Sequence, residues 1–189
     1  LDIGALANHP GLYSNPNANV HSVDELNALD SSVESIIVDS NACKDESFTI
    51  LNMTRFVNLR VLEVGDYSFS YVEVVHLVGL SKLERVVIGE YSFSNLYDPG
   101  NADDCQFHLK NCERLRELRI GSRSFVAYSV FDVENVPSLE VIEIGNVIKN
   151  SQNFYATRQF ELKSTFHGTR MTNRFTQIEI AYSWWIGVP

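Results

Sequence analysis

Three side chains that could ligate a metal stand close together in the segment Cys105-x-x-His108-x-x-x-Cys112. Cysteine and histidine at short spacing are the residue types that structural zinc sites use. The repeated pattern described below argues against zinc, because Cys112 falls in a column of apolar residues and is expected in the core. His108 follows an apolar residue of that pattern, so its side chain should point away from the core. We therefore expect no metal and no cofactor.

The other chemically capable residues form no local catalytic signature. The five histidines are scattered, and none lies in a recognisable Ser-His-Asp or Cys-His arrangement. The glycines of the repeated region occur about once per repeat, not in a phosphate-binding cluster. Asp98, Asp103 and Asp104 offer calcium-type oxygen ligands without EF-hand spacing, and a solvated loop at Pro99-Gly100 is the simpler interpretation. The sequence predicts a protein that is not an enzyme.

The elements that position these residues come from an internal repeat. The pattern apolar-x-x-apolar-x-apolar begins at residues 33, 59, 83, 115, 139 and 175. Three of the intervals are 24 or 26 residues long, and the two longer intervals of 32 and 36 contain insertions. A repeat of this length predicts a solenoid, in which each unit buries its apolar side chains against its neighbours.

Each unit predicts a strand, a corner and an aromatic residue behind the sheet. Alternation of period two predicts parallel strands at residues 36–38, 62–64, 86–88, 118–120, 142–144 and 178–180. A Gly after four of the strands favours a corner with positive φ. The segment Phe131-x-Val133 is interpreted as a short second strand on the opposite side. We expect burial of Leu62, Val86, Leu118, Ile142, Val64, Ile88, Ile120 and Ile144, and one stacked row of Phe69, Phe93 and Phe125.

The chain divides into three parts on this pattern. Residues 1–32 are expected to form an N-terminal cap, with loop composition over residues 1–22 and a short helix after the N-cap Ser22. Residues 33–180 form the solenoid, with insertions near residues 94–106 and 163–173. Residues 181–189 form a C-terminal tail or cap, and adjacent Trp184 and Trp185 there suit either a cap or a partner-binding site.

Composition excludes several classes of partner. A net charge of −9 without a run of basic residues argues against nucleic acid and against anionic lipid surfaces. No apolar stretch is long enough to insert directly into a membrane, and Leu1 opens no signal-peptide pattern. Three cysteines, Cys43, Cys105 and Cys112, are too few for a disulfide scaffold. The triplet Asn52-Met53-Thr54 is the one N-glycosylation sequon, and its use requires secretion.

The motif Leu-x-x-apolar-x-apolar-Gly-x-x-Ser-Phe, at residues 59–69, 83–93 and 115–125, resembles the BspA-like leucine-rich repeats. The resemblance covers residues 33–145 well and residues 146–180 loosely, with Gly at the family's usual Pro. It implies a curved parallel β-solenoid of about six repeats of about 24 residues, with few helices. It also implies a cell-surface or secreted protein of bacteria or anaerobic protists that acts in adhesion or recognition, and it leaves a cytoplasmic location open.

The side chains between the inward apolar positions define the candidate binding surface. They should form two outward rows on the predicted sheet, mixing charged and apolar residues. We expect a non-enzymatic module that binds a protein or glycan ligand there. The alternatives are a plain solvated face, on which Arg85 and Glu117 pair, and an assembly subunit that associates with itself. The candidate partner-binding residues are Glu63, Arg85, Val87, Glu117, Arg119, Val141, Glu143 and Trp184.

Overall fold

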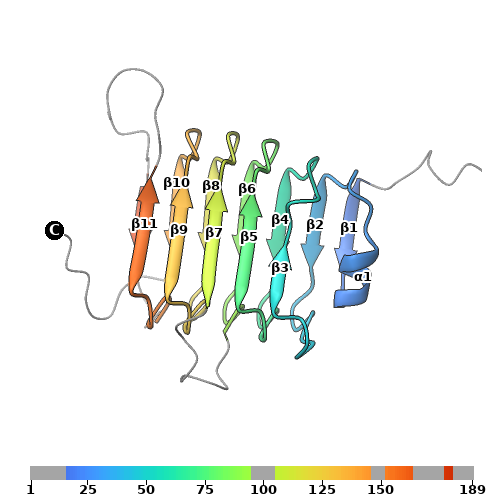
Figure 1. Cartoon of the computed structure of the whole chain (residues 1–189), viewed down its shortest axis with the longest axis horizontal. Helices are drawn as coiled ribbons and strands as arrows, with labels where there is room; N and C mark the ends of the chain where they lie inside the picture. The colour runs from blue at the N-terminus through green and yellow to red at the C-terminus, as the bar shows by residue number, and fades with distance from the viewer. Residues whose placement is uncertain (1–15, 95–104, 146–151, 164–176, 181–189) are drawn as a thin grey trace, which may run out of the picture.

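Two all-parallel β-sheets lie face to face in the computed structural model (Figure 1). The structure describes residues 16–94, 105–145 and 152–163, together with the backbone strand at residues 177–180. Sheet A has seven strands in the order β1-β2-β4-β6-β8-β10-β12, and sheet B has five in the order β11-β9-β7-β5-β3. Beyond β2, successive strands alternate between the sheets in chain order, so that the chain winds as a β-solenoid-like repeat fold.

The elements are short and evenly spaced along the chain. The one helix of the described residues is α1, Val23–Ala28. Sheet A contains β1 (Asn17–Val20), β2 (Ser35–Val38), β4 (Val61–Val64), β6 (Arg85–Ile88), β8 (Glu117–Ile120), β10 (Val141–Ile144) and β12 (Gln177–Ile180). Sheet B contains β3 (Ile50–Asn52), β5 (Val74–Val78), β7 (Gln106–Lys110), β9 (Val130–Glu134) and β11 (Gln159–Lys163).

The six predicted parallel strands are confirmed, and sheet A has a seventh strand that the sequence did not predict. Strand β1 lies in the segment that its composition assigned to a loop, and it pairs in register with β2. Its Val20 is fully buried, whereas Asn17 and Asn19 alternate with it on the outer side. The hydrogen bonds from β2 hold this polar segment extended, because strand formation depends more on its neighbours than on intrinsic propensity.

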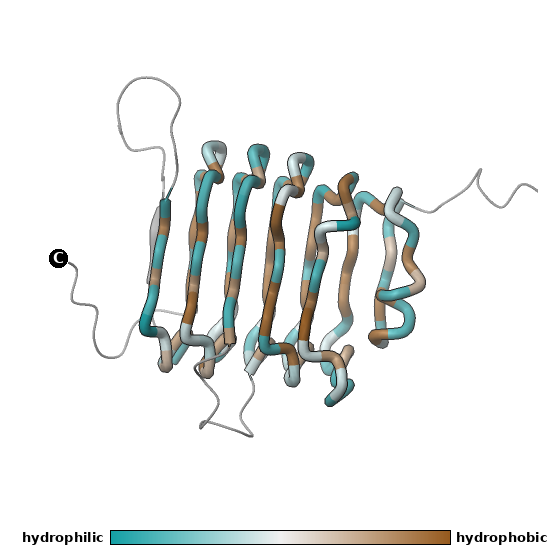
Figure 2. The backbone as a smooth tube through the Cα atoms, viewed as in Figure 1, coloured by the Kyte–Doolittle hydropathy of each residue, from teal (hydrophilic) through white to brown (hydrophobic). Residues whose placement is uncertain are grey.

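The predicted core is confirmed column by column. The eight inward residues of β4, β6, β8 and β10 are at most 3% exposed. Phe93 lies between Phe69 and Phe125, with ring centroids 5.1 and 4.8 Å away and nearly parallel planes. The expected strand at Phe131-x-Val133 is β9, and its Phe131 stacks on Phe107 in a second aromatic row on sheet B. Figure 2 shows the alternation of hydrophobic and hydrophilic residues along the strands.

Of the four glycines that follow strands, Gly145 has the predicted positive φ of +79°, and the other three have a different role. Gly65, Gly89 and Gly121 do not have positive φ, whereas the residues two and four positions later, such as Tyr67 and Phe69, do. A Cβ on Gly65 would lie 2.4 Å from the backbone nitrogen of Ser40 in the preceding unit. Neighbouring corners therefore stack with no room for a side chain, and close approach of the backbones requires glycine.

A ladder of buried serines holds the same corners together. The backbone N–H of Ser68 donates to Ser92 Oγ at 3.2 Å, and that of Ser92 donates to Ser124 Oγ at 3.1 Å. The Ser92 hydroxyl in turn donates to the carbonyl of Gly65 at 2.8 Å. The serine of each Ser-Phe pair thus satisfies backbone groups that the turn removes from water.

The N-terminal helix forms as its sequence predicts. Ser22 is the N-cap, and its side chain accepts a hydrogen bond from the Glu25 backbone N–H at 3.2 Å. At the other end, Arg55 donates to the carbonyl of Leu26 at 2.8 Å and to that of Leu29 at 3.0 Å. Because the last carbonyls of a helix have no partner within it, Arg55 from a later unit fixes α1 to the solenoid.

Candidate recognition surface

The outward side chains of sheet A form the two rows that the sequence predicts. In each row, in-register pairing places the equivalent residues of neighbouring strands side by side. Adjacent parallel strands lie about 4.8 Å apart, so side chains on neighbouring strands can contact one another. One row runs Ser35, Val61, Arg85, Glu117 and Val141, and the other runs Ile37, Glu63, Val87, Arg119 and Glu143.

Five of these residues form a continuous chain of ion pairs across β4, β6, β8 and β10. Arg85 pairs with Glu63 on one side and with Glu117 on the other, the latter at 3.0 Å. Arg119 likewise pairs with both Glu117 and Glu143. The charges therefore alternate from Glu63 to Glu143, and each of the two arginines is shared by two carboxylates. We call this set the ion-pair chain.

The ion-pair chain is partly shielded from water. Side-chain exposure is 25% for Glu117 and 41–42% for the two arginines. Burial acts to raise the pKa of Glu117, but the hydrogen bonds and charges of Arg119 and Arg85 outweigh it and lower this pKa below its usual value. The hydrogen bond to Glu117 raises the pKa of Arg119. Both shifts favour the charged forms, so Glu117 and Arg119 keep their charges across the physiological pH range.

Apolar side chains flank the ion-pair chain. Val61, Val87 and Val141 are half-buried on the same face, and Ile37 is 37% exposed at the β2 end. The described helix, α1, lies at the β1 end of the molecule and does not cover the centre of the sheet (Figure 1). The outer face of sheet A therefore interleaves half-buried apolar side chains with paired charges.

The structure separates the side chains that resembled a zinc site. Cys112 lies in the core column as expected and is fully buried, and His108 points outward from sheet B. Cys105 is also buried, although its sequence position lies outside the columns; its carbonyl accepts a 3.1 Å hydrogen bond from Ser129 Oγ. Burial raises the pKa of the Cys112 thiol to about 11. Within the described residues, no three His, Cys, Asp or Glu side chains form a group able to hold a metal ion.

A second polar row, on the outer face of sheet B, was not predicted. His76 stacks on His108 with ring centroids 5.4 Å apart, and His108 Nδ1 lies 3.5 Å from the carboxylate of Asp132. Lys110 pairs with the same carboxylate, which is nine-tenths buried, and the hydrogen bond to Asp132 raises the pKa of Lys110. Burial, and then the charge of His108, lower the pKa of His76. The repeat contained a signal for this row, since His76, His108 and Asp132 share one outward column and Lys110 lies in the neighbouring outward column.

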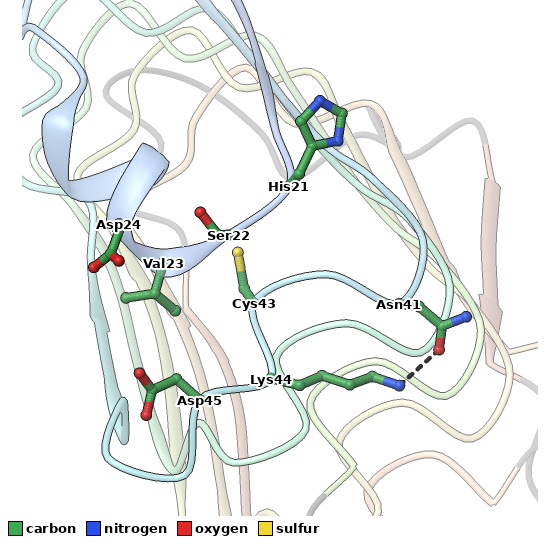
Figure 3. A pocket seen from close by; sticks show the side chains of 8 residues that line it. All are labelled: His21, Ser22, Val23, Asp24, Asn41, Cys43, Lys44 and Asp45. Carbon is green, nitrogen blue, oxygen red and sulfur yellow. Dashed lines mark hydrogen bonds between the residues drawn. The ribbon is translucent and has the colours of Figure 1, made fainter.

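The described part of the chain also contains a small pocket of about 330 Å³ beside α1 (Figure 3). Its polar lining is largely engaged: His21 pairs with Asp39 at 2.6 Å, and Lys44 donates to Asn41 at 2.6 Å. Burial raises the pKa of Cys43, which also lines the pocket, to about 11. A thiol with this pKa is protonated at neutral pH and is a weak nucleophile. Trp184, the remaining predicted site residue, lies outside the described residues.

These features define the class of protein as a β-solenoid-like repeat protein with a charged and apolar face on sheet A. No protein-family model, curated protein or solved structure matches the chain. Among the described residues, the single helix is too short to cross a membrane.

Proposed function

We propose that this chain is a non-enzymatic recognition module of the leucine-rich repeat type, which binds a protein partner through the outer face of sheet A. The observation that carries the proposal is the ion-pair chain set among Val61, Val87 and Val141. Its charges are held in place by one another, so that binding a complementary surface requires little reordering of side chains.

The type of repeat supports the same function. The Leu-x-x-apolar-x-apolar-Gly-x-x-Ser-Phe motif places its apolar positions in the core and its variable positions on an open sheet face. In this arrangement the face can diverge in sequence while the core columns keep the fold. Resemblance to BspA-like repeats favours a cell-surface or secreted location, where the ligand would be a protein or a glycan of another cell.

The test exchanges every charge of the ion-pair chain at once. The variant carries Glu63→Arg, Arg85→Glu, Glu117→Arg, Arg119→Glu and Glu143→Arg. The alternating pairs are then preserved in reverse, while the electrostatic pattern presented to a partner is inverted. The matched control is Arg60→Glu with Glu84→Arg, which reverses a 2.8 Å surface pair outside the two rows.

Binders are first selected from a displayed library of extracellular protein domains with the unmodified chain as bait, and are then measured by surface plasmon resonance. We expect the five-residue variant to bind at least about tenfold more weakly, a loss of about 1.4 kcal/mol. The control variant should bind normally. Binders that bind the five-residue variant normally, and fail on Trp184→Ala instead, would place recognition at the end of the chain.

An assembly subunit is the second candidate. Strand β3 is one of the two terminal strands of the described sheet B, and its Ile50 is 53% exposed. An exposed apolar side chain on a terminal strand can contact another copy. Light scattering over a range of protein concentrations distinguishes the two functions, because a concentration-independent monomer favours the recognition module and a rising mass favours assembly.

A further inference from the structure

We propose that Asn52, on the terminal strand β3 of sheet B, is an acceptor site for an N-linked oligosaccharide, and that the glycan shields the exposed Ile50 on the same face of this strand. The triplet Asn52-Met53-Thr54 has the sequence that the modification requires, with no proline at its centre.

The fold presents both functional residues of the triplet to solvent. Asn52 and Thr54 are exposed, whereas Met53 between them is 1% exposed and belongs to the core. This follows from the alternation of an extended chain, which sends the first and third residues to one side and the middle residue to the other. A glycan on Asn52 therefore extends outward without displacing any core side chain.

Hydrogen bonding leaves the reactive atom of Asn52 facing outward. Its Oδ1 accepts from the backbone N–H of Thr54 at 3.0 Å and from the Thr54 hydroxyl at 2.7 Å. Because the backbone N–H can only donate, the oxygen must be the atom that faces Thr54. The amide Nδ2, which receives the sugar, makes no hydrogen bond within the described residues.

The oligosaccharide is transferred to Asn52 from a donor in which it is linked to a lipid pyrophosphate. A bond forms between Asn52 Nδ2 and C1 of the first sugar, while the bond between C1 and the phosphate oxygen breaks. The electron pair of that bond leaves with the lipid pyrophosphate, and the amide loses one proton to a base of the transferase. The product adds no charge at Asn52.

The surroundings of Asn52 give the glycan a physical role. Ile50, two residues earlier on the same face of β3, is 53% exposed. Strand β3 pairs with β5 on one side, and within the described residues no strand pairs with its other side. A bulky glycan beside Ile50 shields this apolar side chain from contact with another chain, which is the hazard that exposed apolar residues on a terminal strand carry.

The test follows the full chain into the lumen of endoplasmic reticulum microsomes, behind a eukaryotic signal peptide. Lumenal chains are identified by protection from added protease. We expect protected chains to carry one glycan, which N-glycosidase removes while converting residue 52 to aspartate, as read by peptide mass spectrometry. Thr54→Ser should keep the modification, and Thr54→Val, of similar size, should abolish it. Protected chains that remain unmodified would overturn the proposal.

A second measurement tests the shielding of Ile50. The glycosylated protein and the Thr54→Val protein are compared by light scattering over the same concentrations, after circular dichroism has shown the same β-structure in both. We expect the protein without the glycan to self-associate at lower concentration. Identical association, or loss of β-structure in the glycosylated chain alone, would contradict the proposed shielding.

Discussion

Phe93 offers the sharpest test of how the solenoid is stabilised. Its side chain is 1% exposed and lies between Phe69 and Phe125. Truncation of a buried Phe to Ala typically costs about 3–5 kcal/mol. Two stacked neighbours place Phe93→Ala toward the upper part of this range, since each aromatic pair adds about 0.5–1.5 kcal/mol beyond the buried area.

The backbone at Phe93 makes a second, less usual prediction. Its φ is +55°, in the left-handed region that costs an L-residue about 1–2 kcal/mol and costs glycine nothing. Glycine in a strand interior is instead less favourable than alanine by about 0.5–1 kcal/mol. Phe93→Gly should therefore be more stable than Phe93→Ala by up to about 1 kcal/mol, whereas in β6 Val86→Gly should be less stable than Val86→Ala.

Urea unfolding, followed by circular dichroism, measures these four variants under one set of conditions. Within each Ala–Gly pair, the two variants have lost nearly the same side chain. The difference between their free energies of unfolding therefore reports mainly the backbone preference at that position. A loss below about 1 kcal/mol for Phe93→Ala would show that the aromatic row contributes little to the core, since buried Phe truncations cost several times more. If Gly were less stable than Ala at position 93, the left-handed backbone would not be a source of strain.

Three further predictions concern the corners, the histidines and the thiols. Gly89→Ala should lose about 1–3 kcal/mol in urea unfolding, because the new Cβ would lie 2.6 Å from the Asp66 backbone nitrogen; Gly79→Ala, with φ +73° and open space, should lose less. Because its pKa is lowered by burial and by His108, His76 binds a proton more readily in the unfolded chain. Stability should therefore be full above the ordinary pKa of 6.5 and fall as the pH drops below it, and His76→Gln should reduce that fall in unfolding at pH 7.5 and 5.5. The three buried cysteines should resist iodoacetamide in the folded protein and react in urea, as counted by mass spectrometry; labelling of folded Cys112 would contradict its burial and its raised pKa.

The sequence alone was sufficient for six of the seven strands of sheet A, for β9 of sheet B and for the core columns. Apolar residues at fixed offsets from Leu59, Leu83, Leu115 and Leu139 predicted which strands form and which side chains are buried. The same offsets put Glu63, Val87 and Arg119 in one outward row, and the register confirms it. This works because a solenoid unit contacts mainly its neighbours, so that a local pattern repeated at a fixed period contains most of the structural information.

Other features depended on distances between units, which a sequence pattern does not contain. Gly65 is required by the backbone of Ser40 at 2.4 Å, and not by its own φ. Strand β1 forms because β2 offers it hydrogen bonds, although its composition is that of a loop. Burial of Cys105 likewise depends on how two units meet at a corner.

The candidate surface shows the same division. The sequence predicted which charged side chains face outward, and it predicted the pair between Arg85 and Glu117. Only the tertiary structure showed that Arg85 also reaches Glu63, and that Arg119 joins Glu117 to Glu143 in one continuous chain. The physical reason is that side-chain identity and direction follow from the repeat, whereas the choice of ion-pair partner depends on register and rotamer, which packing of the whole sheet decides.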